Sequence, residues 1–127
     1  MLIASLNANK GLGTPGRASL RQAWLDHWRP DLLFVQEPCT ARSDPAVEVA
    51  GYEHLGGNTN VGVWRRARSS VAKGWSVAVQ GERWLSLTSG RLAIHDVYFP
   101  SGAARERAEL LDRLTAQFSQ QRDHVHW

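Results

Sequence analysis

The sequence has very little cysteine: Cys39 is the single thiol among 127 residues. One cysteine excludes an internal disulfide and a zinc site built from several thiolates, and it suits a reducing, cytoplasmic compartment. The sequence also lacks an apolar run long enough to span a bilayer. Its N-terminus is apolar over too few residues, and lacks the basic leader, to be a signal peptide. These absences predict a chain with no membrane partner.

Neither sign of charge dominates the sequence. Fifteen Lys and Arg residues stand against twelve Asp and Glu, which gives a net charge of +3. That balance permits an anionic partner without requiring one. The composition, 43% hydrophobic and 21% charged, is that of an ordinary globular protein. A length of 127 residues allows one domain with one core, so we expect residues 1–127 to form a single domain.

The first part of the sequence predicts a strand, a helix and a second strand. A short apolar run over 2–6 ends at Asn7, and a second run over 32–35 has no polar alternation, which is typical of a strand buried on both faces. Between them, a helical spacing of apolar and aromatic residues predicts a helix over about 17–28. Its expected buried stripe consists of Leu20, Ala23, Trp24, His27 and Trp28. Because short loops connect the two strands to the helix, this segment is expected to form a βαβ unit with parallel strands.

The ends of these two strands predict a shared polar rim. The second apolar run finishes with Gln36 and Glu37, and Pro38 then stops the hydrogen-bonding ladder. Neighbouring parallel strands end on the same edge, about 4.8 Å apart, and ligands of open α/β sheets bind there. Asn7 and Glu37 are therefore expected to face one crevice. An amide oxygen and a carboxylate suit a magnesium ion, which keeps several waters and takes one or two protein carboxylates.

After residue 45 the sequence predicts short β segments and one more helix. A hairpin is expected from 52–55 and 61–64 around the turn GGNTN, with further strands over 75–79, 83–88 and 92–99, the last ended by Pro100. Ser101 is the expected N-cap of a helix through Gln120 whose buried stripe is Leu110, Leu111, Leu114 and Phe118. If both helices shield one sheet face, the second apolar face of the last strand is left uncovered. That face predicts self-association or a completing partner chain.

Four segments, SLNANKGL, DLLFVQEP, VGVWRR and HDVYFPSG, occur in an order that resembles the first half of the endonuclease/exonuclease/phosphatase superfamily, in its nuclease-like branch. The resemblance covers most of the chain. It implies an α/β (α+β) fold that is half of a four-layered α/β/β/α sandwich, with a mixed sheet and two main helices. It also implies cleavage of phosphate esters that depends on magnesium, or on manganese in its place.

The resemblance assigns roles to individual residues of this sequence. Glu37 matches the metal-binding glutamate of the QE motif, and Asn7 matches an asparagine that helps arrange the metal and its phosphate. Tyr98 matches the tyrosine of a Y-x-P motif, whose hydroxyl contacts the scissile phosphate in the nuclease branch. Asp96 stands two residues earlier, where relatives often have asparagine, and is a further candidate. Structural readings stay open beside these: a salt-bridged carboxylate for Glu37, a turn residue for Asn7 and a core aromatic for Tyr98.

The resemblance also implies later motifs that this sequence does not contain. Relatives continue with G-D-x-N, whose aspartate aligns the attacking water, and then with a D-H pair that binds metal. This sequence ends at DHVHW, where the strand leading into G-D-x-N would begin, so we expect an N-terminal half truncated before that motif. The expected function is metal-dependent phosphoric ester hydrolysis by a nuclease-like phosphodiesterase acting on DNA or RNA. The alternative is a non-catalytic remnant or assembly module that lacks the catalytic aspartate and histidine.

Two further clusters have a functional and a structural interpretation. His124 and His126 share a strand face and, with Asp123, resemble a metal site, but frayed chain ends of this kind usually bind nothing. The arginines at 65, 66 and 68 could meet nucleic-acid phosphates, although a solvated surface run is the more common case.

Overall fold

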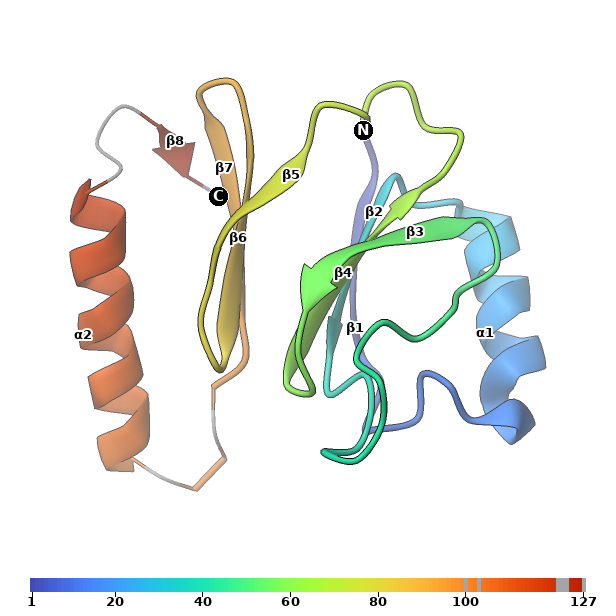
Figure 1. The fold of residues 1–127 in the computed structure, drawn as a ribbon, viewed down its shortest axis with the longest axis horizontal. Helices are drawn as coiled ribbons and strands as arrows, with labels where there is room; N and C mark the ends of the chain where they lie inside the picture. The colour runs from blue at the N-terminus through green and yellow to red at the C-terminus, as the bar shows by residue number, and fades with distance from the viewer. Residues whose placement is uncertain (100, 103, 121–123, 127) are drawn as a thin grey trace.

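The structure, a computed structural model, describes residues 1–99, 101–102, 104–120 and 124–126. Pro100, expected to end a strand, and Asp123, expected beside two histidines, lie outside these residues. The described part of the chain forms two four-stranded sheets and two helices (Figure 1). Neither of these helices is long and apolar enough to cross a membrane.

The first sheet contains the predicted βαβ unit. Its strands lie in the order β1 (Ile3–Asn7), β2 (Leu32–Gln36), β4 (Val61–Arg66) and β3 (Tyr52–Gly57). β1 and β2 are parallel, with Asn7 opposite Gln36, and β4 is antiparallel to both β2 and β3. The uninterrupted apolar run of β2 is buried from Leu32 to Val35, as expected for a strand covered on both faces. The parallel pair and the hairpin are thus confirmed.

The second sheet is built from the remaining strands. They lie in the order β5 (Ser76–Gln80), β6 (Trp84–Ser89), β7 (Leu92–Val97) and β8 (Val125–His126). The first three are antiparallel to their neighbours, and the short β8 joins β7 in parallel. The strands expected at 75–79, 83–88 and 92–99 are therefore confirmed, with shifted ends.

The two sheets pack face to face, and each carries one helix on its outer face (Figure 1). The inner core joins both sheets through nine buried side chains, among them Phe34, Val63, Leu85, Leu87 and Ile94. α1 (Pro15–Trp28) closes the first sheet through Leu25, and α2 (Ala104–Gln120) closes the second through Leu110 and Leu114. The layers are α/β/β/α, so the predicted fold class is confirmed. Each fully buried Leu or Val side chain stabilises such a core by about 1.5 to 3 kcal/mol.

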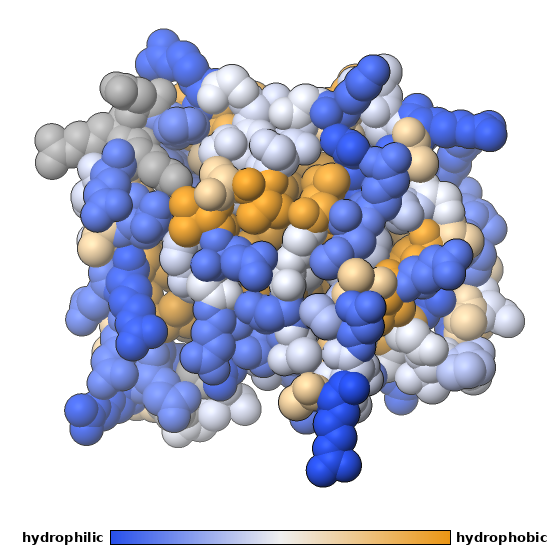
Figure 2. All heavy atoms as spheres, viewed as in Figure 1, coloured by the Kyte–Doolittle hydropathy of each residue, from blue (hydrophilic) through white to orange (hydrophobic). Residues whose placement is uncertain are grey.

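The prediction of an uncovered face on the last long strand is wrong. Ile94 of β7 packs into the inner core between the sheets, and Val97 packs on the other side against the side chains of α2. The strands divide into two sheets, so each sheet offers its inner face to the other and needs only one helix outside. Spacing along the sequence could not show this, because it does not say which strands hydrogen-bond to which. In the direction of view of Figure 1, hydrophobic residues reach the surface as a central band and a second group at the right, with hydrophilic residues around them (Figure 2).

The predicted buried stripe of the first helix is also wrong. Leu25 is the buried residue of α1, whereas Leu20 is 78% exposed and Trp28 56% exposed. His27, expected to pack in the interior, is exposed and contacts the Trp28 ring edge-on. Consecutive residues of a helix lie about 100° apart around its axis. When Leu25 faces the sheet, Trp24 and the residues in line with it therefore point away from the sheet. In α2 the expected stripe is confirmed except at Leu111, which is 56% exposed.

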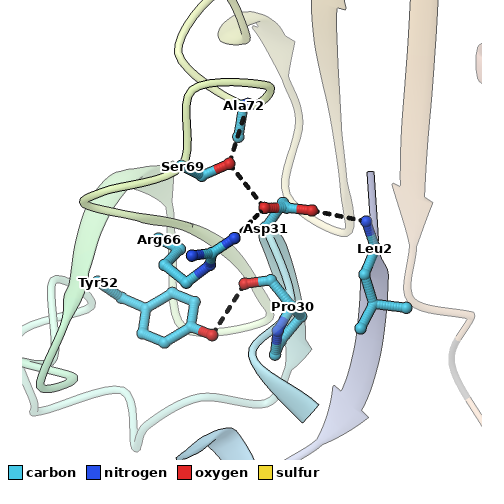
Figure 3. Close-up of polar contacts among 7 residues, drawn as sticks. All are labelled: Leu2, Pro30, Asp31, Tyr52, Arg66, Ser69 and Ala72. Carbon is cyan, nitrogen blue, oxygen red and sulfur yellow. Dashed lines mark hydrogen bonds and ion pairs between the residues drawn. The ribbon is translucent and has the colours of Figure 1, made fainter.

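A buried carboxylate ties the starts of β1 and β2 to the end of β4 (Figure 3). Asp31 Oδ2 accepts a hydrogen bond from the Leu2 amide at 2.7 Å, and Oδ1 accepts from Ser69 Oγ at 2.7 Å and from Arg66 Nη2 at 2.5 Å. Burial opposes ionisation of Asp31, but the hydrogen bonds from Ser69, Leu2 and Arg66 outweigh it and lower the pKa of the carboxyl.

The basic cluster at 65–68 is largely taken up by such pairs. Arg66 pairs with Asp31, and Arg65 Nη2 lies 2.6 Å from Glu53 Oε2. The Glu53 side chain is 51% exposed, so its pair with Arg65 is a surface ion pair. The two pairs therefore support the structural interpretation of the cluster.

We expect Asp31→Ala to lower the free energy of unfolding by about 3 to 5 kcal/mol, because it leaves the buried partners of the carboxylate without an acceptor. The matched control, Glu53→Ala, should cost less than about 1 kcal/mol. Urea unfolding at pH 7 measures both, and equal losses would contradict the account. Because the folded pKa of Asp31 is lowered, its contribution is present above the ordinary carboxyl pKa and is lost as the pH falls through the folded pKa. The difference between wild type and Asp31→Ala should therefore shrink below about pH 4.

Candidate functional site

The candidate site lies at the end of the sandwich where β1 and β2 finish, at the bottom of Figure 1. The loop after β1 is held to the end of β2: the Ala8 amide donates to the Gln36 carbonyl at 2.9 Å, and the Lys10 amide donates to the Glu37 carbonyl at 2.6 Å. Glu37 itself has a φ of +49°. A left-handed backbone costs a non-glycine residue about 1 to 2 kcal/mol. The surrounding hydrogen bonds maintain it and so fix where the Glu37 side chain projects.

Tyr98 and Glu37, predicted to share one site, are in contact. The Tyr98 hydroxyl donates a hydrogen bond of 2.6 Å to Glu37 Oε1, although the two residues are 61 positions apart and follow strands of different sheets. This hydrogen bond raises the pKa of Tyr98, and burial adds to the effect, so the phenol remains a donor at neutral pH. The Tyr98 ring also lies under the guanidinium of Arg83, 5.5 Å from the ring centre. Tyr98 thus presents its hydroxyl at the rim.

Asn7 lies on the same rim, one strand away from Glu37. It stands opposite Gln36 in the β1–β2 register, its side chain is exposed, and its Oδ1 accepts a hydrogen bond of 2.9 Å from the Asn9 amide. This local hydrogen bond closes a turn after β1, as the structural interpretation of Asn7 predicts. The described residues show no hydrogen bond between Asn7 and Glu37. The structure therefore brings the two residues to one edge without joining them directly.

Asp96 takes a different position from the other predicted site residues. It is 7% exposed and lies between the sheets, where Gln36 Nε2 donates to its Oδ1 at 2.5 Å. Gln36 Nε2 also donates to Ser5 Oγ at 3.1 Å, and Asp96 Oδ2 is buried without a hydrogen-bond partner among the described residues. Burial raises the pKa of Asp96 from its ordinary 3.8 to about 6, against the opposing effect of the Gln36 hydrogen bond. Asp96 therefore links the sheets behind the rim.

Two asparagines of the β3–β4 turn complete the rim from the other side. Asn58 Nδ2 donates to the Gly81 carbonyl at 2.9 Å, and Asn60 Nδ2 donates to the Glu82 carbonyl at 3.1 Å, which joins the turns of the two sheets. The Asn60 carbonyl also accepts the amide of Glu37 at 2.8 Å. Sequence reasoning assigned these asparagines to a turn only. Their side-chain partners are more than 20 residues away and left no signal in the local pattern.

The side-chain oxygen atoms at the rim suit, as ligands, a hydrated dication that is bound by few protein groups. Glu37 uses Oε1 to accept the Tyr98 hydrogen bond, and its Oε2 has no hydrogen-bond donor among the described residues. Magnesium takes one or two carboxylates and retains several waters, so one carboxylate and a nearby amide oxygen suit it. The residues do not suit an ion caged by protein ligands, because the described chain holds no cluster of three or more His, Cys, Asp or Glu that could bind a metal.

Histidines of β7 and β8 contact each other on the side of the second sheet that faces α2. His95 Nε2 lies 2.7 Å from His126 Nδ1, and His95 Nδ1 lies 2.7 Å from Ser86 Oγ. The His95 ring also packs on Phe118 of α2 at 4.1 Å between ring centres. Burial, with a contribution from His126, lowers the pKa of His95 to about 4, so this ring is neutral at physiological pH.

Comparison with known proteins finds similarity in structure. No protein-family model matches the chain, and no curated protein matches its sequence. The AP endonuclease from Archaeoglobus fulgidus matches with a TM-score of 0.63 and 20% identity, over 94% of this chain and 52% of that one. Danio rerio TDP2, complexed with a single-strand DNA product, matches with a TM-score of 0.54 and 18% identity, over 94% and 54%. The AP endonuclease LMAP from Leishmania major matches with a TM-score of 0.51 and 19% identity, over 92% and 45%.

The likeness to these three structures confirms the fold that the sequence motifs imply. The chain spans about half the length of the structures it matches. At identities of 18 to 20% the likeness establishes the fold alone. The contact between Glu37 and Tyr98 comes from the geometry of this chain itself.

We expect Asp96→Asn to remove a pH dependence of stability. As the pH rises from about 4 to 6, the unfolded chain releases the Asp96 proton while the folded protein retains it, so this residue lowers stability over that range. The full effect, reached above about pH 6, is on the order of 1 to 3 kcal/mol. Urea unfolding of both proteins between pH 4 and 7.5 should show the difference moving in favour of the variant as the pH rises. A difference independent of pH would contradict the raised pKa.

Proposed function

We propose that this chain carries part of the active site of a magnesium-dependent phosphoesterase, specifically a nuclease-like phosphodiesterase acting on nucleic acid. The observation that carries the proposal is the hydrogen bond between Tyr98 and Glu37 at the open end of the sandwich. The fold supports it, since the matching structures include two AP endonucleases and a TDP2 complexed with a single-strand DNA product.

Each side chain at the rim has a distinct role in this proposal. Glu37 would hold the dication through its carboxylate, and Asn7, at the end of the neighbouring strand, would offer its side-chain oxygen. The bound ion would neutralise phosphoryl charge, an effect worth several kcal/mol. Tyr98 would transfer its hydrogen bond from Glu37 to a phosphoryl oxygen, where the bond strengthens as the transition state gathers charge. Manganese would serve in the same position, since it prefers the same oxygen ligands.

Backbone hydrogen bonds hold Glu37 and Tyr98 at the rim. The backbone of Glu37 is held by hydrogen bonds to the Asn60 carbonyl and from the Lys10 amide. The Tyr98 amide donates a hydrogen bond of 2.8 Å to the Arg83 carbonyl. Donors that are fixed before the substrate arrives need no reorganisation during the reaction, which is the main source of electrostatic catalysis. The hydrogen bonds that hold the rim therefore support the proposed catalytic role.

The alternative, a non-catalytic module, rests on a specific observation. The sequence contains no G-D-x-N motif and hence no aspartate of that kind to align an attacking water. Asp96 is a further carboxyl at this end of the sandwich, but it is 7% exposed and hydrogen-bonded to Gln36, which leaves it badly placed to contact solvent water. A competent general base is thus missing from the described rim.

We expect the chain to bind Mg²⁺ weakly at Glu37, and Glu37→Gln to abolish this binding because it removes the carboxylate charge. Tyr98→Phe should retain binding, since it only frees Glu37 Oε1. Glu53→Gln, at an exposed carboxylate of β3, is the matched control and should bind as wild type does. Isothermal titration measures all four proteins. Absence of binding in wild type, or equal binding in Glu37→Gln, would contradict the proposed metal site.

We expect the chain alone to nick supercoiled plasmid DNA only slowly and only with Mg²⁺, because the described residues of the rim include no competent general base. Glu37→Gln and Tyr98→Phe should each remove the residual activity, and Glu53→Gln should keep it. Gel analysis of the nicked fraction over time measures this. Robust nicking would refute the expected low activity and the non-catalytic alternative together. Complete inactivity in a protein that binds Mg²⁺ through Glu37 would instead favour the assembly module.

A further inference from the structure

Glu37 and Tyr98 are joined twice, once directly and once through the turns of both sheets. Directly, the Tyr98 hydroxyl donates to Glu37 Oε1 at 2.6 Å. On the longer path, the Glu37 amide donates to the Asn60 carbonyl at 2.8 Å, and Asn60 Nδ2 donates to the Glu82 carbonyl at 3.1 Å. Arg83, the residue after Glu82, accepts the Tyr98 amide at 2.8 Å. These residues form a closed circuit, in which Asn60 makes the step from the first sheet to the second.

Asn60 is itself held by the turn between β3 and β4. Asn58 Oδ1 accepts the Asn60 amide at 2.8 Å and the Val61 amide at 3.2 Å, which fixes the turn. Asn58 Nδ2 donates to the Gly81 carbonyl at 2.9 Å, so the two asparagines contact consecutive carbonyl groups, those of Gly81 and Glu82. A carbonyl accepts and cannot donate, so the contact at Glu82 requires a side chain with a donor. The Asn60 amide meets that requirement.

The direct link between Glu37 and Tyr98 is the one that a phosphate would break. In the proposed function, the Tyr98 hydroxyl leaves the Glu37 carboxylate for a phosphoryl oxygen. The longer path contains backbone groups and Asn60 Nδ2, none of which takes part in this transfer. Groups that act together in a site have to stay within about 0.5 Å of their productive geometry. The path through Asn60 can maintain that geometry after the hydroxyl has moved.

A second link between the sheets lies inside the protein, behind the rim. Gln36 Nε2 donates to Asp96 Oδ1 at 2.5 Å. This bond joins side chains one position before Glu37 and two positions before Tyr98, so it acts on the strands and not on the peptide groups of the site residues. Asn60 instead accepts the amide of Glu37 itself, whose φ of +49° is maintained by its surroundings. Asn60 is therefore the more direct support of the rim.

We propose that Asn60 is a positioning residue of the rim, which holds Glu37 at a fixed separation from Tyr98 while the Tyr98 hydroxyl is bonded to a phosphoryl oxygen. The inference rests on the proposed function, because it is there that a phosphate takes the hydroxyl away from the carboxylate. Asn60 contacts neither the ion nor the phosphate in this role. It acts through the Glu37 amide and through the Glu82 carbonyl, next to the residue that accepts the Tyr98 amide.

Nuclear Overhauser effects between the ring of residue 98 and the Glu37 side chain, measured without metal, test the proposal. Tyr98→Phe removes the direct hydrogen bond, and the ring should stay beside Glu37 because the path through Asn60 remains. Adding Asn60→Leu, an uncharged change of similar size that cannot donate, should remove most of the effect. Asn60→Leu alone should remove less, since the hydroxyl still binds Glu37. Thr59→Val in the Tyr98→Phe protein, an isosteric change in the same turn, is the matched control and should preserve the effect.

Two further measurements separate positioning from stability and from metal binding. Asp31→Asn weakens the network at the opposite end of the sandwich, and in the Tyr98→Phe protein it should leave the Overhauser effect unchanged. Titration with Mg²⁺ tests the proposed function separately, because the Overhauser comparison needs no metal. Loss of the effect in Tyr98→Phe alone would overturn the proposal. So would its persistence after Asn60→Leu is added, or an equal loss with Thr59→Val or Asp31→Asn.

Discussion

The packing of the two sheets against each other is the constraint on which the rest of the molecule depends. The inner core of side chains such as Phe34 and Leu87 fixes how far the end of β2 lies from the end of β7. Glu37 follows β2 and Tyr98 follows β7, so their hydrogen bond exists only because the sheets meet in this register. The asparagine turn and the contact between Gln36 and Asp96 hold the same end of the sandwich together.

Neighbouring polar groups at the rim differ in their surroundings. Glu37 accepts a hydrogen bond from a residue outside its own sheet and retains a carboxylate oxygen for another partner. Asp96, only two residues before Tyr98, is buried with a raised pKa and joins the sheets behind the rim. Burial separates the two carboxyl groups: one remains available for an ion, while the other is a link inside the protein.

Sequence reasoning succeeded where local chemistry determines the structure. The apolar run of β2 and the short joints around α1 were enough to place Asn7 and Glu37 on one edge, because a βαβ unit leaves little choice of topology. The role of Tyr98 came from family resemblance, and its partner could not be predicted from spacing across 61 residues. The division into two sheets and the rotation of α1 that exposes Trp24 depend on tertiary packing, which periodicity within a single element does not encode.

The central claim is that strands of both sheets deliver a carboxylate and a phenol to one rim that binds a dication. Paramagnetic line broadening in NMR spectra, with Mn²⁺ added in small amounts, tests this claim most directly. The account predicts that the amides of Asn7, Glu37 and Tyr98 broaden together and first, and that Glu37→Gln removes the effect. Broadening centred elsewhere in the chain, or equal broadening in Glu37→Gln, would contradict it.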